Sequence, residues 1–441
     1  MAYKIGLVSL GCAKNQTDAE MMLSLLIEDG CETVNEPSEA DIIIINTCGF
    51  IDSAKQESIE AILEMAEYKE TGVCKKLIVT GCLAERYADD ILNELPEVDA
   101  VLGTGDYDRI NEIIKSAFSE KEKPVISGHI DRTPECVLPR VLLTPPYTAY
   151  LKIADGCDNN CTYCAIPKIR GHFRSRSIES IYNEAVELAQ RGVKEIILIA
   201  QDTTRYGSDT GTNLSQLLEK LVGIEKIEWI RIHYYYSEAI TKELIDTMAK
   251  YDKICNYIDM PVQHADNYIL RRMARRTHRE EMEEKIAYMR KKLKNCYIRT
   301  SIIVGFPGET EDHFNNLYDF VEKMRFDRMG VFTYSCEEGT AAAEFEDQVD
   351  EDIKQQRYDS LMSLQQQISL DINRSKIGSE LEVLVEGYDE DNFLFYGRGR
   401  GDSIDVDGKI YFATEEEVNP GDIINVKILD ASEYDLTGER I

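Results

Sequence analysis

The sequence predicts an α/β protein with three parts: an N-terminal doubly wound parallel-sheet domain, a central partial (β/α)6 barrel and a C-terminal small antiparallel β-barrel. Apolar runs alternate with helical patterns through most of the chain, as in parallel sheets covered by helices. One run, Ile42–Ile45, is four consecutive isoleucines, which is typical of a strand buried on both faces. The last 65 residues instead show short strands separated by Gly and Asp turns, which is typical of a small barrel.

The N-terminal domain is predicted to span residues 1–139. Its predicted strands are "YKIGLVSLG", "DIIIINT", "KKLIVTG" and "VDAVLGTG", and helical patterns at 17–29 and 53–69 lie between them. A Pro-containing linker, "RTPECVLPRVLLTPPY", separates this domain from the next one.

The central domain is predicted to span residues 140–375 and to form an open barrel. Its strand runs are "AYLKIADG", "VKEIILIAQD", "IEWIRIHYYY", "CNYIDMPVQ", "YIRTSIIVGFP" and "RMGVFTYS". A closed barrel of this kind would need eight such units. A charged helix at 350–375 ends the domain, and the small barrel follows at residues 376–441.

The chain is strongly acidic, with 81 acidic and 50 basic residues and a net charge of −31. Such a chain repels nucleic acid unless a local basic patch intervenes, so direct nucleic-acid binding is not expected. A basic protein is a more natural large partner, although the charge also serves solubility alone. No apolar run has the length of a membrane span, and the start of the chain resembles a first strand more than a secretion signal, so a cytoplasmic protein is expected.

Three cysteines follow predicted strands of the N-terminal sheet. Cys12, Cys48 and Cys82 come directly or almost directly after "KIGLVSLG", "DIIIINT" and "KKLIVTG". The carboxyl ends of parallel strands meet at one edge of a sheet, where ligands bind, so the three thiols are expected to converge. Three converging thiolates suit an iron–sulfur cluster or a soft metal, whereas a single cysteine at such a place is more often a small buried residue.

A second group of cysteines follows the first strand of the central domain. In "DGCDNNCTYCAIP", Cys157, Cys161 and Cys164 have the spacing C-x3-C-x2-C. Three thiolates this close can bind three irons of a 4Fe–4S cluster and leave the fourth iron open. A redox pair of Cys161 and Cys164 leaves the third cysteine unexplained, and a structural zinc site would need a fourth ligand such as His172.

The spacing of the second group resembles that of radical S-adenosylmethionine (SAM) enzymes, and nearly the whole chain resembles their methylthiotransferase family. The residues that carry the resemblance are "LGCAKNQTDAE", "NTCGFIDSAKQES", "IADGCDNNCTYCAIPKIRGHFRSR", "AQDTTRYG", "FTYSCEEGT" and "FYGRGRGD". Within the family, the likeness is to the members that methylthiolate an aspartate of ribosomal protein S-twelve. Ala13 and Ser237 depart from residues that are frequent in the family, but neither is at a ligand position.

The resemblance implies two 4Fe–4S clusters, an auxiliary one on Cys12, Cys48 and Cys82 and a radical one on Cys157, Cys161 and Cys164. It also implies that one SAM supplies a methyl group and a second SAM supplies the radical that removes a hydrogen from the aspartate β-carbon. The implied C-terminal domain is a TRAM barrel. The implied partners are ribosomal protein S-twelve and an electron donor such as a flavodoxin or ferredoxin.

Three further residues are candidates for cofactor binding. Tyr163 lies between two of the radical-cluster cysteines and is expected near the adenine of SAM, although an aromatic ring that shields the loop is the alternative. Gly305 and Gly308, in "VGFPGET", would let the backbone approach the cofactor, although a tight turn also needs glycine. The basic run from Lys168 to Arg176 is a candidate to bind a carboxylate of cofactor or substrate.

Two other functions remain open from the residues. A tRNA-adenosine methylthiotransferase should carry positive charge on its C-terminal barrel, but residues 377–441 contain 17 acidic and 5 basic residues. A non-catalytic iron–sulfur redox protein would account for six ligating cysteines but not for a cluster with an open iron at the mouth of a barrel. The other six cysteines are predicted to be structural: Cys31, Cys74, Cys136, Cys255, Cys296 and Cys336.

Overall fold

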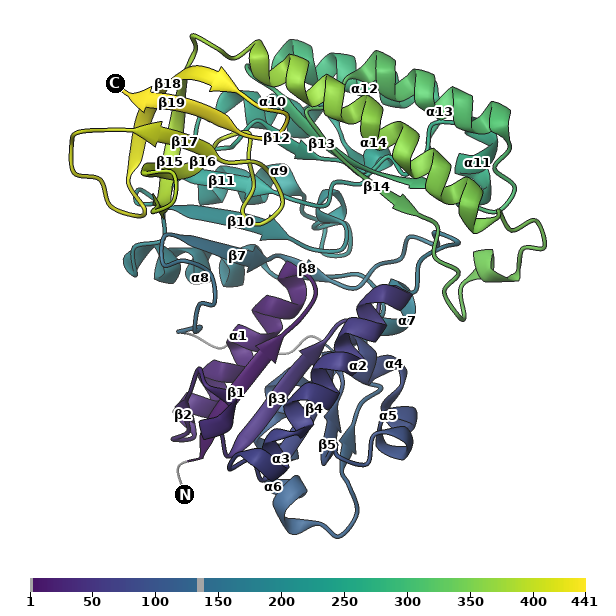
Figure 1. The fold of residues 1–441 in the computed structure, drawn as a ribbon, viewed down its shortest axis with the longest axis vertical. Helices are drawn as coiled ribbons and strands as arrows, with labels where there is room; N and C mark the ends of the chain where they lie inside the picture. The colour runs from purple at the N-terminus through teal and green to yellow at the C-terminus, as the bar shows by residue number, and fades with distance from the viewer. Residues whose placement is uncertain (1–2, 133–138) are drawn as a thin grey trace.

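The computed structural model describes residues 3–132 and 139–441. Part of the predicted linker, residues 133–138 with Cys136 among them, lies outside the described residues. Figure 1 shows a lower N-terminal domain in purple and blue, a central domain in teal and green above it, and a small yellow barrel at one side of the central domain.

The N-terminal domain is built on one parallel sheet of six strands in the order β2-β1-β3-β4-β5-β6. The strands are β1 (Lys4–Ser9), β2 (Glu32–Thr33), β3 (Ile42–Thr47), β4 (Lys76–Gly81), β5 (Ala100–Leu102) and β6 (Val125–Ile126). All six residues of β3 are buried, as its isoleucine run predicts. The chain passes from one side of β1 to the other between β2 and β3, so the sheet has a switch point between β1 and β3, where open sheets bind ligands.

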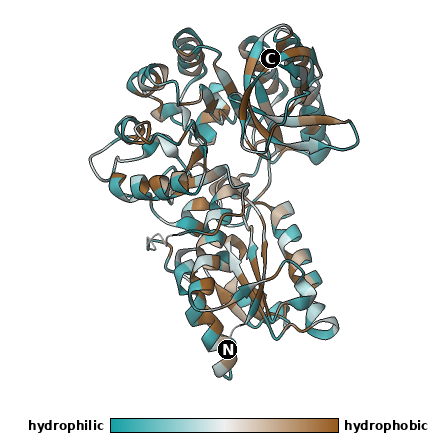
Figure 2. Ribbon diagram, turned by 90° about the vertical axis from the view of Figure 1, so that its left-hand side faces the viewer, coloured by the Kyte–Doolittle hydropathy of each residue, from teal (hydrophilic) through white to brown (hydrophobic). Residues whose placement is uncertain are grey.

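Helices cover both faces of this sheet. The helices of the domain are α1 (Ala13–Glu28), α2 (Asp52–Ala66), α3 (Tyr68–Thr71), α4 (Cys82–Arg86), α5 (Ala88–Glu94) and α6 (Ile110–Ser119). One apolar core joins α1 and α6 to the sheet, and a second joins α2, α4 and α5 to its other face. Figure 2 shows hydrophobic residues concentrated on the strands in the middle of the domain, with helices of mixed polarity outside them.

Two helices of this domain differ from their predicted bounds. The helical pattern predicts a start at residue 17, but α1 begins at Ala13. The N-cap residue of α1 is Cys12, whose side chain forms no capping hydrogen bond, so the sequence gives no capping signal for this start. The pattern at 53–69 is divided into α2 and α3 near Glu67. The earlier start of α1 matters for function, since it adds the residues from Ala13 to Gln16 to a helix whose N-cap is Cys12.

The central domain contains six parallel strands, as predicted. The strands are β7 (Thr148–Lys152), β10 (Glu195–Ile199), β11 (Trp229–Ile232), β12 (Tyr257–Asp259), β13 (Tyr297–Val304) and β14 (Arg328–Thr333). They form two three-stranded sheets, β11-β10-β7 and β12-β13-β14, and a parallel bridge from Ile230 to Ile254 connects the two. A two-stranded antiparallel ribbon of β8 (Ala154–Asp155) and β9 (Arg174–Ser175) lies beyond β7.

The helices of the central domain cover the outside of its strands and share with them the largest apolar core of the described residues. They are α7 (Ile166–Arg170), α8 (Ile178–Gln190), α9 (Leu214–Leu221), α10 (Lys242–Lys250), α11 (Asn267–Arg272), α12 (Arg279–Lys292), α13 (Glu311–Met324) and α14 (Glu351–Arg374). Polar N-caps fix the starts of several of them, and Asn213 and Thr310 form capping boxes with Gln216 and His313.

The C-terminal domain is a closed five-stranded barrel in the order β15-β16-β17-β19-β18. Its strands are β15 (Glu380–Asp389), β16 (Leu394–Gly399), β17 (Ile410–Ala413), β18 (Ile423–Ala431) and β19 (Leu436–Arg440). The neighbouring strands are antiparallel except for β17 and β19, which are parallel. Alternate apolar side chains, such as Val383 and Phe412, fill its interior.

The loop from β16 to β17 anchors the small barrel in the central domain. Ser403 and His233 form a buried hydrogen bond of 2.7 Å between Oγ and Nε2. Ile404 packs against Tyr150, Ile197 and neighbouring strand residues. The loop therefore enters the interior of the six-stranded array, and the small barrel is positioned by buried contacts.

In the ranges 3–132 and 139–441, no helix combines the length and the apolar character that crossing a bilayer requires.

Candidate functional site

The structure brings Cys12, Cys48 and Cys82 to the carboxyl ends of three adjacent strands. Cys12 is the N-cap of α1, Cys48 follows β3, and Cys82 is the first residue of α4. Gly11 has φ +88°, and a Cβ at Gly11 would lie 2.9 Å from the Cβ of Cys48. The glycine therefore lets the loop that carries Cys12 approach Cys48 closely.

The three thiols differ in exposure and in acidity. Cys82 is buried, Cys48 is half-buried and Cys12 is exposed. Burial raises the pKa of Cys82 to about 12 and also raises the pKa of Cys48. Desolvation also disfavours the charged thiolate form of Cys12. The positive charges of Lys14 and Arg170 stabilise this form more strongly, so the pKa of Cys12 is lowered. The charges of the other two thiols, Cys12 and Cys48, add to the raised pKa of Cys82.

Asn15 holds the backbone around this site. Its Nδ2 donates to the carbonyl oxygens of Thr47, at 2.8 Å, and of Leu10, at 3.2 Å. Its Oδ1 lies 3.4 Å from the Sγ of Cys82. One buried amide on the first turn of α1 thus connects the ends of β1, β3 and β4.

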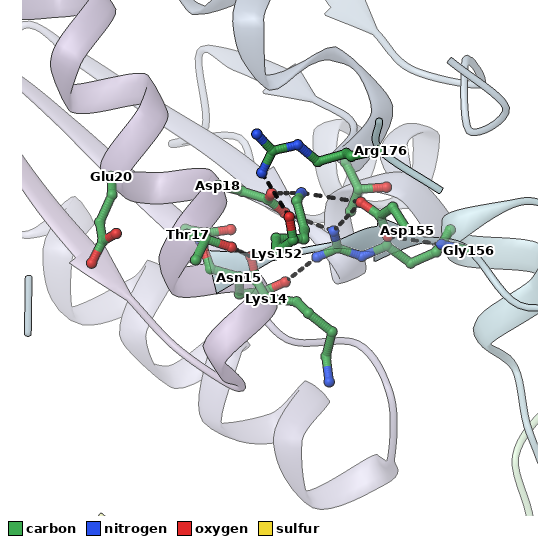
Figure 3. Close-up of polar contacts among 12 residues, drawn as sticks. Lys14, Asn15, Thr17, Asp18, Glu20, Lys152, Asp155, Gly156 and Arg176 are labelled. Atoms are coloured by element: carbon green, nitrogen blue, oxygen red, sulfur yellow. Dashed lines mark hydrogen bonds and ion pairs between the residues drawn. The ribbon is translucent and has the colours of Figure 1, made fainter. Parts of the chain in front are cut away.

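A buried network of charges lies next to Asn15, at the interface between the N-terminal and central domains (Figure 3). Asp18 on α1 pairs with Arg170 of α7 at 2.7 Å and with Lys152 of β7 at 2.5 Å. Asp155 accepts from the same two cations, at 3.4 and 3.1 Å. Burial opposes the charge of Asp155, but Lys152 and Arg170 hold the pKa of this carboxyl below its usual range.

Arg170 connects this network to the cysteines. Its side chain is buried, and its Nη2 lies 2.6 Å from the Oδ1 of Asn15 and 3.9 Å from the Sγ of Cys82. The residue ends the short helix α7 (Ile166–Arg170), which begins two residues after Cys164. A single short segment of the central domain therefore runs from the second cysteine group to the first.

The second cysteine group lies in the loop between β8 and α7, beyond the carboxyl end of β7. The amide of Cys157 donates to the carbonyl of Gly171, and the amide of Cys164 donates to that of Cys161. Burial raises the pKa of Cys157 to about 11 and also raises that of Cys164, and the neighbouring cysteines add to both shifts. The spacing C-x3-C-x2-C thus gives a loop in which the three thiols interact with one another.

Tyr163 packs among apolar side chains in this loop. Its neighbours include Ile269, Met273 and Phe306, and burial raises the pKa of its hydroxyl. Gly305 and Gly308, which follow β13, both have positive φ, +71° and +83°. A Cβ on Gly305 would collide with the side chain of Lys354, so this glycine is required by local packing as well as by its backbone.

The basic run from Lys168 to Arg176 serves contacts within the chain. Arg170 belongs to the buried network, Lys168 donates to the carbonyl of Gly339 at 2.6 Å, and Arg176 pairs with Glu184 at 2.6 Å. His172 is exposed, and its Nδ1 lies 3.0 Å from Asp158 Oδ1. Among the described residues, no three His, Cys, Asp or Glu side chains are arranged to hold a metal ion. In a 4Fe–4S site each thiolate binds a different iron, so its sulfurs surround a cluster and do not meet at one ion.

The segment that follows β11, residues 233–236, contacts the small barrel, the N-terminal domain and the second cysteine group. His233 binds the loop of the small barrel, Tyr234 lies against Lys14 of the N-terminal domain, and the hydroxyl of Tyr236 lies 3.4 Å from the Sγ of Cys161. Tyr234 has φ +59°, which turns its ring toward the N-terminal domain while its amide donates to Asp259. The stretch therefore lies between the two cysteine groups.

A cavity of about 310 Å³ lies beside Cys12. The N-terminal domain contributes Gly11 and Gln16 to its walls, and the small barrel contributes Ile404 and Asp405. Leu10 of the N-terminal domain, and Leu143 and Pro145 from the segment before β7, add apolar groups to the walls. The N-terminal domain and the small barrel thus both border the most exposed of the six candidate ligands.

Sequence reasoning missed the residues that connect the two cysteine groups. Asp18 and Arg170 pair across 152 positions of sequence, and no local pattern reveals such a pair. The signal available for Lys14 and Asn15 is their place directly after Cys12, in "GCAKN", once the helix is known to begin there.

Comparison with known protein families covers each domain. The model of the radical SAM superfamily matches residues 151–321, that of the uncharacterized protein family UPF0004 matches residues 4–103, and that of the TRAM domain matches residues 377–441. Among solved structures, the radical SAM methyltransferase TsrM from Kitasatospora setae is similar in fold, with a TM-score of 0.57 and 11% sequence identity over 86% of this chain and 79% of that chain.

Curated relatives match the chain from end to end. The ribosomal protein uS12 methylthiotransferase RimO of Clostridioides difficile is 50% identical over 99% of this chain and 98% of that protein. The proteins of the same name from Clostridium novyi and Desulforamulus reducens are each 51% identical over 99% of this chain. With half of its residues identical over nearly its whole length, this chain belongs to the RimO family of ribosomal protein uS12 methylthiotransferases.

Proposed function

We propose that this protein methylthiolates the β-carbon of an aspartate in ribosomal protein uS12, using two molecules of SAM and two 4Fe–4S clusters. The observation that carries the proposal is a short segment of the central domain that leads from the second cysteine triad to the first across the domain interface. Arg170, six residues after Cys164, lies 3.9 Å from the Sγ of Cys82. A carrier of electrons needs no such pairing, whereas the transfer of a sulfur-containing group to a carbon needs the two reactive centres side by side.

The donor sets fit the proposed clusters. Cys12, Cys48 and Cys82 offer three thiol groups at adjacent strand ends, and Cys157, Cys161 and Cys164 offer three in one loop. Each set leaves one iron of a 4Fe–4S cluster without a protein ligand. When bound, the clusters and SAM supply one-electron chemistry and a methyl group, which side-chain acids and bases do not supply.

The chain's own residues hold this arrangement together. Asn15 fixes the three strand ends of the auxiliary site, and the pairing of Asp18 with Arg170 and Lys152 fixes α1 on the central domain. Glu337, which follows β14, accepts from Lys55 at 3.0 Å and lies 3.5 Å from Arg86, on the other side of the N-terminal sheet. The two domains are therefore joined by buried ion pairs on both sides of the proposed site.

We infer that Tyr163, Gly305 and Gly308 contribute to the SAM site. Tyr163 lies in the cysteine loop and packs against Phe306, which stands between the two glycines. A SAM bound to the open iron of the radical cluster would extend from that loop. The functional units of the chain are then residues 1–139 with the auxiliary cluster, 140–375 as the radical SAM core and 376–441 as the TRAM domain.

Charge favours a protein substrate over RNA. Residues 377–441 carry 17 acidic and 5 basic residues, and this barrel borders the cavity beside Cys12 through Asp405. An acidic barrel repels phosphate and attracts a basic protein such as a ribosomal one. We further propose a cytoplasmic location, where ribosomal proteins are found, and a low-potential electron donor such as a flavodoxin or ferredoxin.

Mass spectrometry of two candidate substrates tests the proposed function. Anaerobically reconstituted and reduced protein is incubated with SAM, a sulfide source and either a peptide containing the target aspartate of uS12 or unmodified tRNA. We expect the mass gain of one methylthio group in place of hydrogen on the peptide, none on tRNA, and none with Cys164→Ala. A gain on tRNA alone would refute the proposed substrate, and cleavage of SAM without either product would leave the substrate class unsupported.

A further inference from the structure

Lys14 is a buried lysine that has neither an ion pair nor a hydrogen bond from its ammonium among the described residues. The residue is 8% exposed, so the ammonium has lost most of its water. Among the described residues, the direct partner of its ammonium is the ring of Tyr234, whose centroid lies 3.2 Å from Nζ. Figure 3 shows the side chain directed away from the charge network on the next turn of α1, with no polar contact at its nitrogen. A buried cation without a direct ion pair is costly, which makes it a candidate for binding an anion.

The acidic side chains near Lys14 already have other partners. Asp155 is bound by Lys152, Arg170 and Gln201, and Asp259 is bound by Arg299 at 2.9 Å and by the amide of Tyr234. Both carboxylates and the thiolate of Cys12 act on Lys14 electrostatically, Cys12 most strongly, but none of them forms an ion pair or a hydrogen bond with its ammonium. The ammonium of Lys14 is therefore available to form an ion pair with an anionic group of a ligand.

The position of Lys14 is between the two proposed clusters. It follows the auxiliary-site residue Cys12 by two positions on α1, and it lies on the ring of Tyr234. Two residues beyond Tyr234, the hydroxyl of Tyr236 lies 3.4 Å from the Sγ of Cys161 in the radical loop. A substrate carbon that reacts with both centres has to enter this region.

We propose that Lys14 binds the side-chain carboxylate of the target aspartate and so positions its β-carbon between the two sites. The proposal rests on the proposed function. An ammonium and a carboxylate form a charge-assisted hydrogen bond, and the β-carbon is bonded directly to the carboxyl carbon that is held. Such a pair favours aspartate over asparagine at the target position, since asparagine offers no negative charge to a desolvated cation.

SAM also carries a carboxylate and is the alternative source of the same chemistry. One observation favours the substrate. Lys14 belongs to the N-terminal domain and to the helix that begins at Cys12, whereas the radical-loop cysteines, Tyr163 and the glycines after β13 all belong to the central domain. The network of Asp18 and Arg170 also fixes α1, so Lys14 has a defined position before any ligand binds.

Peptide binding separates these possibilities without relying on turnover. Labelled uS12 peptides with aspartate or asparagine at the target position are titrated against the anaerobic holoenzyme, and fluorescence anisotropy gives the two dissociation constants. We expect the wild type to bind the aspartate peptide about tenfold or more tightly than the asparagine peptide, the ratio that a charged hydrogen bond supplies. Lys14→Met should bind both equally, and Lys14→Arg should keep the preference.

Lys14→Gln serves as a second neutral variant that keeps a hydrogen-bond donor, and Lys115→Met removes an exposed lysine of the same domain as the matched control. Iron content and far-UV circular dichroism establish that each variant is folded and loaded. A preference for aspartate that persists in both Lys14→Met and Lys14→Gln would overturn the proposal. So would a loss of SAM affinity in Lys14→Met as large as its loss of affinity for the aspartate peptide, because the ammonium would then serve the cofactor.

The two proposals fail in different ways. If the wild type adds no methylthio group to the aspartate peptide and binds neither peptide, the proposed function fails and this inference with it. If the wild type modifies the aspartate peptide but Lys14→Met discriminates aspartate from asparagine as the wild type does, only the role of Lys14 is refuted.

Discussion

Three of the six candidate cysteines directly follow a glycine with positive φ, a feature that they share with Cys31, which follows Gly30 at φ +87°. Cys12 and Cys82 each follow a glycine with positive φ, Gly11 and Gly81, and the tight turn brings each thiol to the sheet edge. The loop that holds Cys157 contains another such glycine, Gly156, whose missing side chain leaves room for the carbonyl of His172. These turns follow from glycine's freedom to adopt a left-handed backbone.

The cysteine assignments predict a defined loss of iron. Replacement of Cys12, Cys48 and Cys82 by alanine should remove half of the iron and sulfide of the reconstituted protein, and replacement of Cys157, Cys161 and Cys164 should remove the other half. Iron and sulfide analysis with electron paramagnetic resonance measures each loss. Cys31→Ala, a half-buried cysteine outside both groups, is the control. Full iron content in either triple variant would contradict the assignment.

Arg170 is predicted to be essential for the domain interface. Arg170→Met leaves Asp18 and Asp155 buried with Lys152 as their remaining strong cationic partner, and such a change costs about 3–5 kcal/mol of unfolding free energy. Urea denaturation measures the loss. The matched control is Arg325→Met, which breaks an exposed pair with Asp371 and should cost about 1 kcal/mol or less. Equal effects of the two changes would show that the buried network does not stabilise the fold.

At the scale of elements, most strands and helices could be predicted because their hydrophobic periods are regular. The isoleucine run gives β3, and the six apolar runs of the central domain give six parallel strands. The start of α1 could not be predicted, since Cys12 is not a capping residue type. Contacts between elements far apart in sequence were equally hidden: Arg170 meets Asp18, and the loop at Ser403 enters the central domain. The candidate ligands were predictable from spacing, but the residues that join their two sites were not.

The docking of the small barrel depends on one buried carboxylate at the start of β10. Glu195 pairs with Arg398 of the barrel at 2.7 Å and with Arg231 of β11 at 2.8 Å. Burial opposes its charge, but the two guanidiniums lower the pKa of Glu195 to about 2. The carboxylate is thus held in its charged form by the two cations that it neutralises.

Glu195→Gln should loosen the small barrel, because two buried guanidiniums lose their common counter-ion. The expected cost is about 3–5 kcal/mol. Trp229 is the only tryptophan of the chain, and its Nε1 donates to Glu382 of the barrel at 2.6 Å, so its fluorescence reports on this interface. We expect the urea midpoint followed by Trp229 to fall. The control is Glu112→Gln, which changes an exposed carboxylate of the N-terminal domain. An unchanged urea midpoint in Glu195→Gln would show that Glu195 does not hold the small barrel in place.

For the whole molecule, acid is predicted to weaken the interface at His233. Burial lowers the pKa of His233 from its ordinary value of 6.5 to about 4. The positive charges of Arg231 and Arg299 add to this shift, and the negative charges of Asp259 and Glu195 oppose it. The unfolded chain therefore takes up a proton first as the pH falls. Stability is fully present above about pH 6.5 and decreases as the pH falls toward about 4, by roughly 3 kcal/mol in total.

Unfolding free energies followed by Trp229 fluorescence between pH 7 and pH 4 test this prediction. His233→Gln keeps a polar group opposite Ser403 but does not titrate, so its stability should depend less on pH in this window. Glu195 contributes in a separate and more acidic range, since its pKa is lowered from 4.5 to about 2. A wild type and a His233→Gln variant with the same slope between pH 6.5 and pH 4 would refute the role of His233.

The measurement that tests the central claim most directly is the mass of uS12 from cells. A bacterial host that lacks its own uS12 methylthiotransferase is supplied with this chain or with its Cys164→Ala variant, and uS12 is isolated from its ribosomes. We predict that the wild-type chain adds one methylthio group to uS12, on the β-carbon of an aspartate, and that the variant adds none. An unmodified uS12 in the presence of the folded, cluster-loaded wild type would contradict the account.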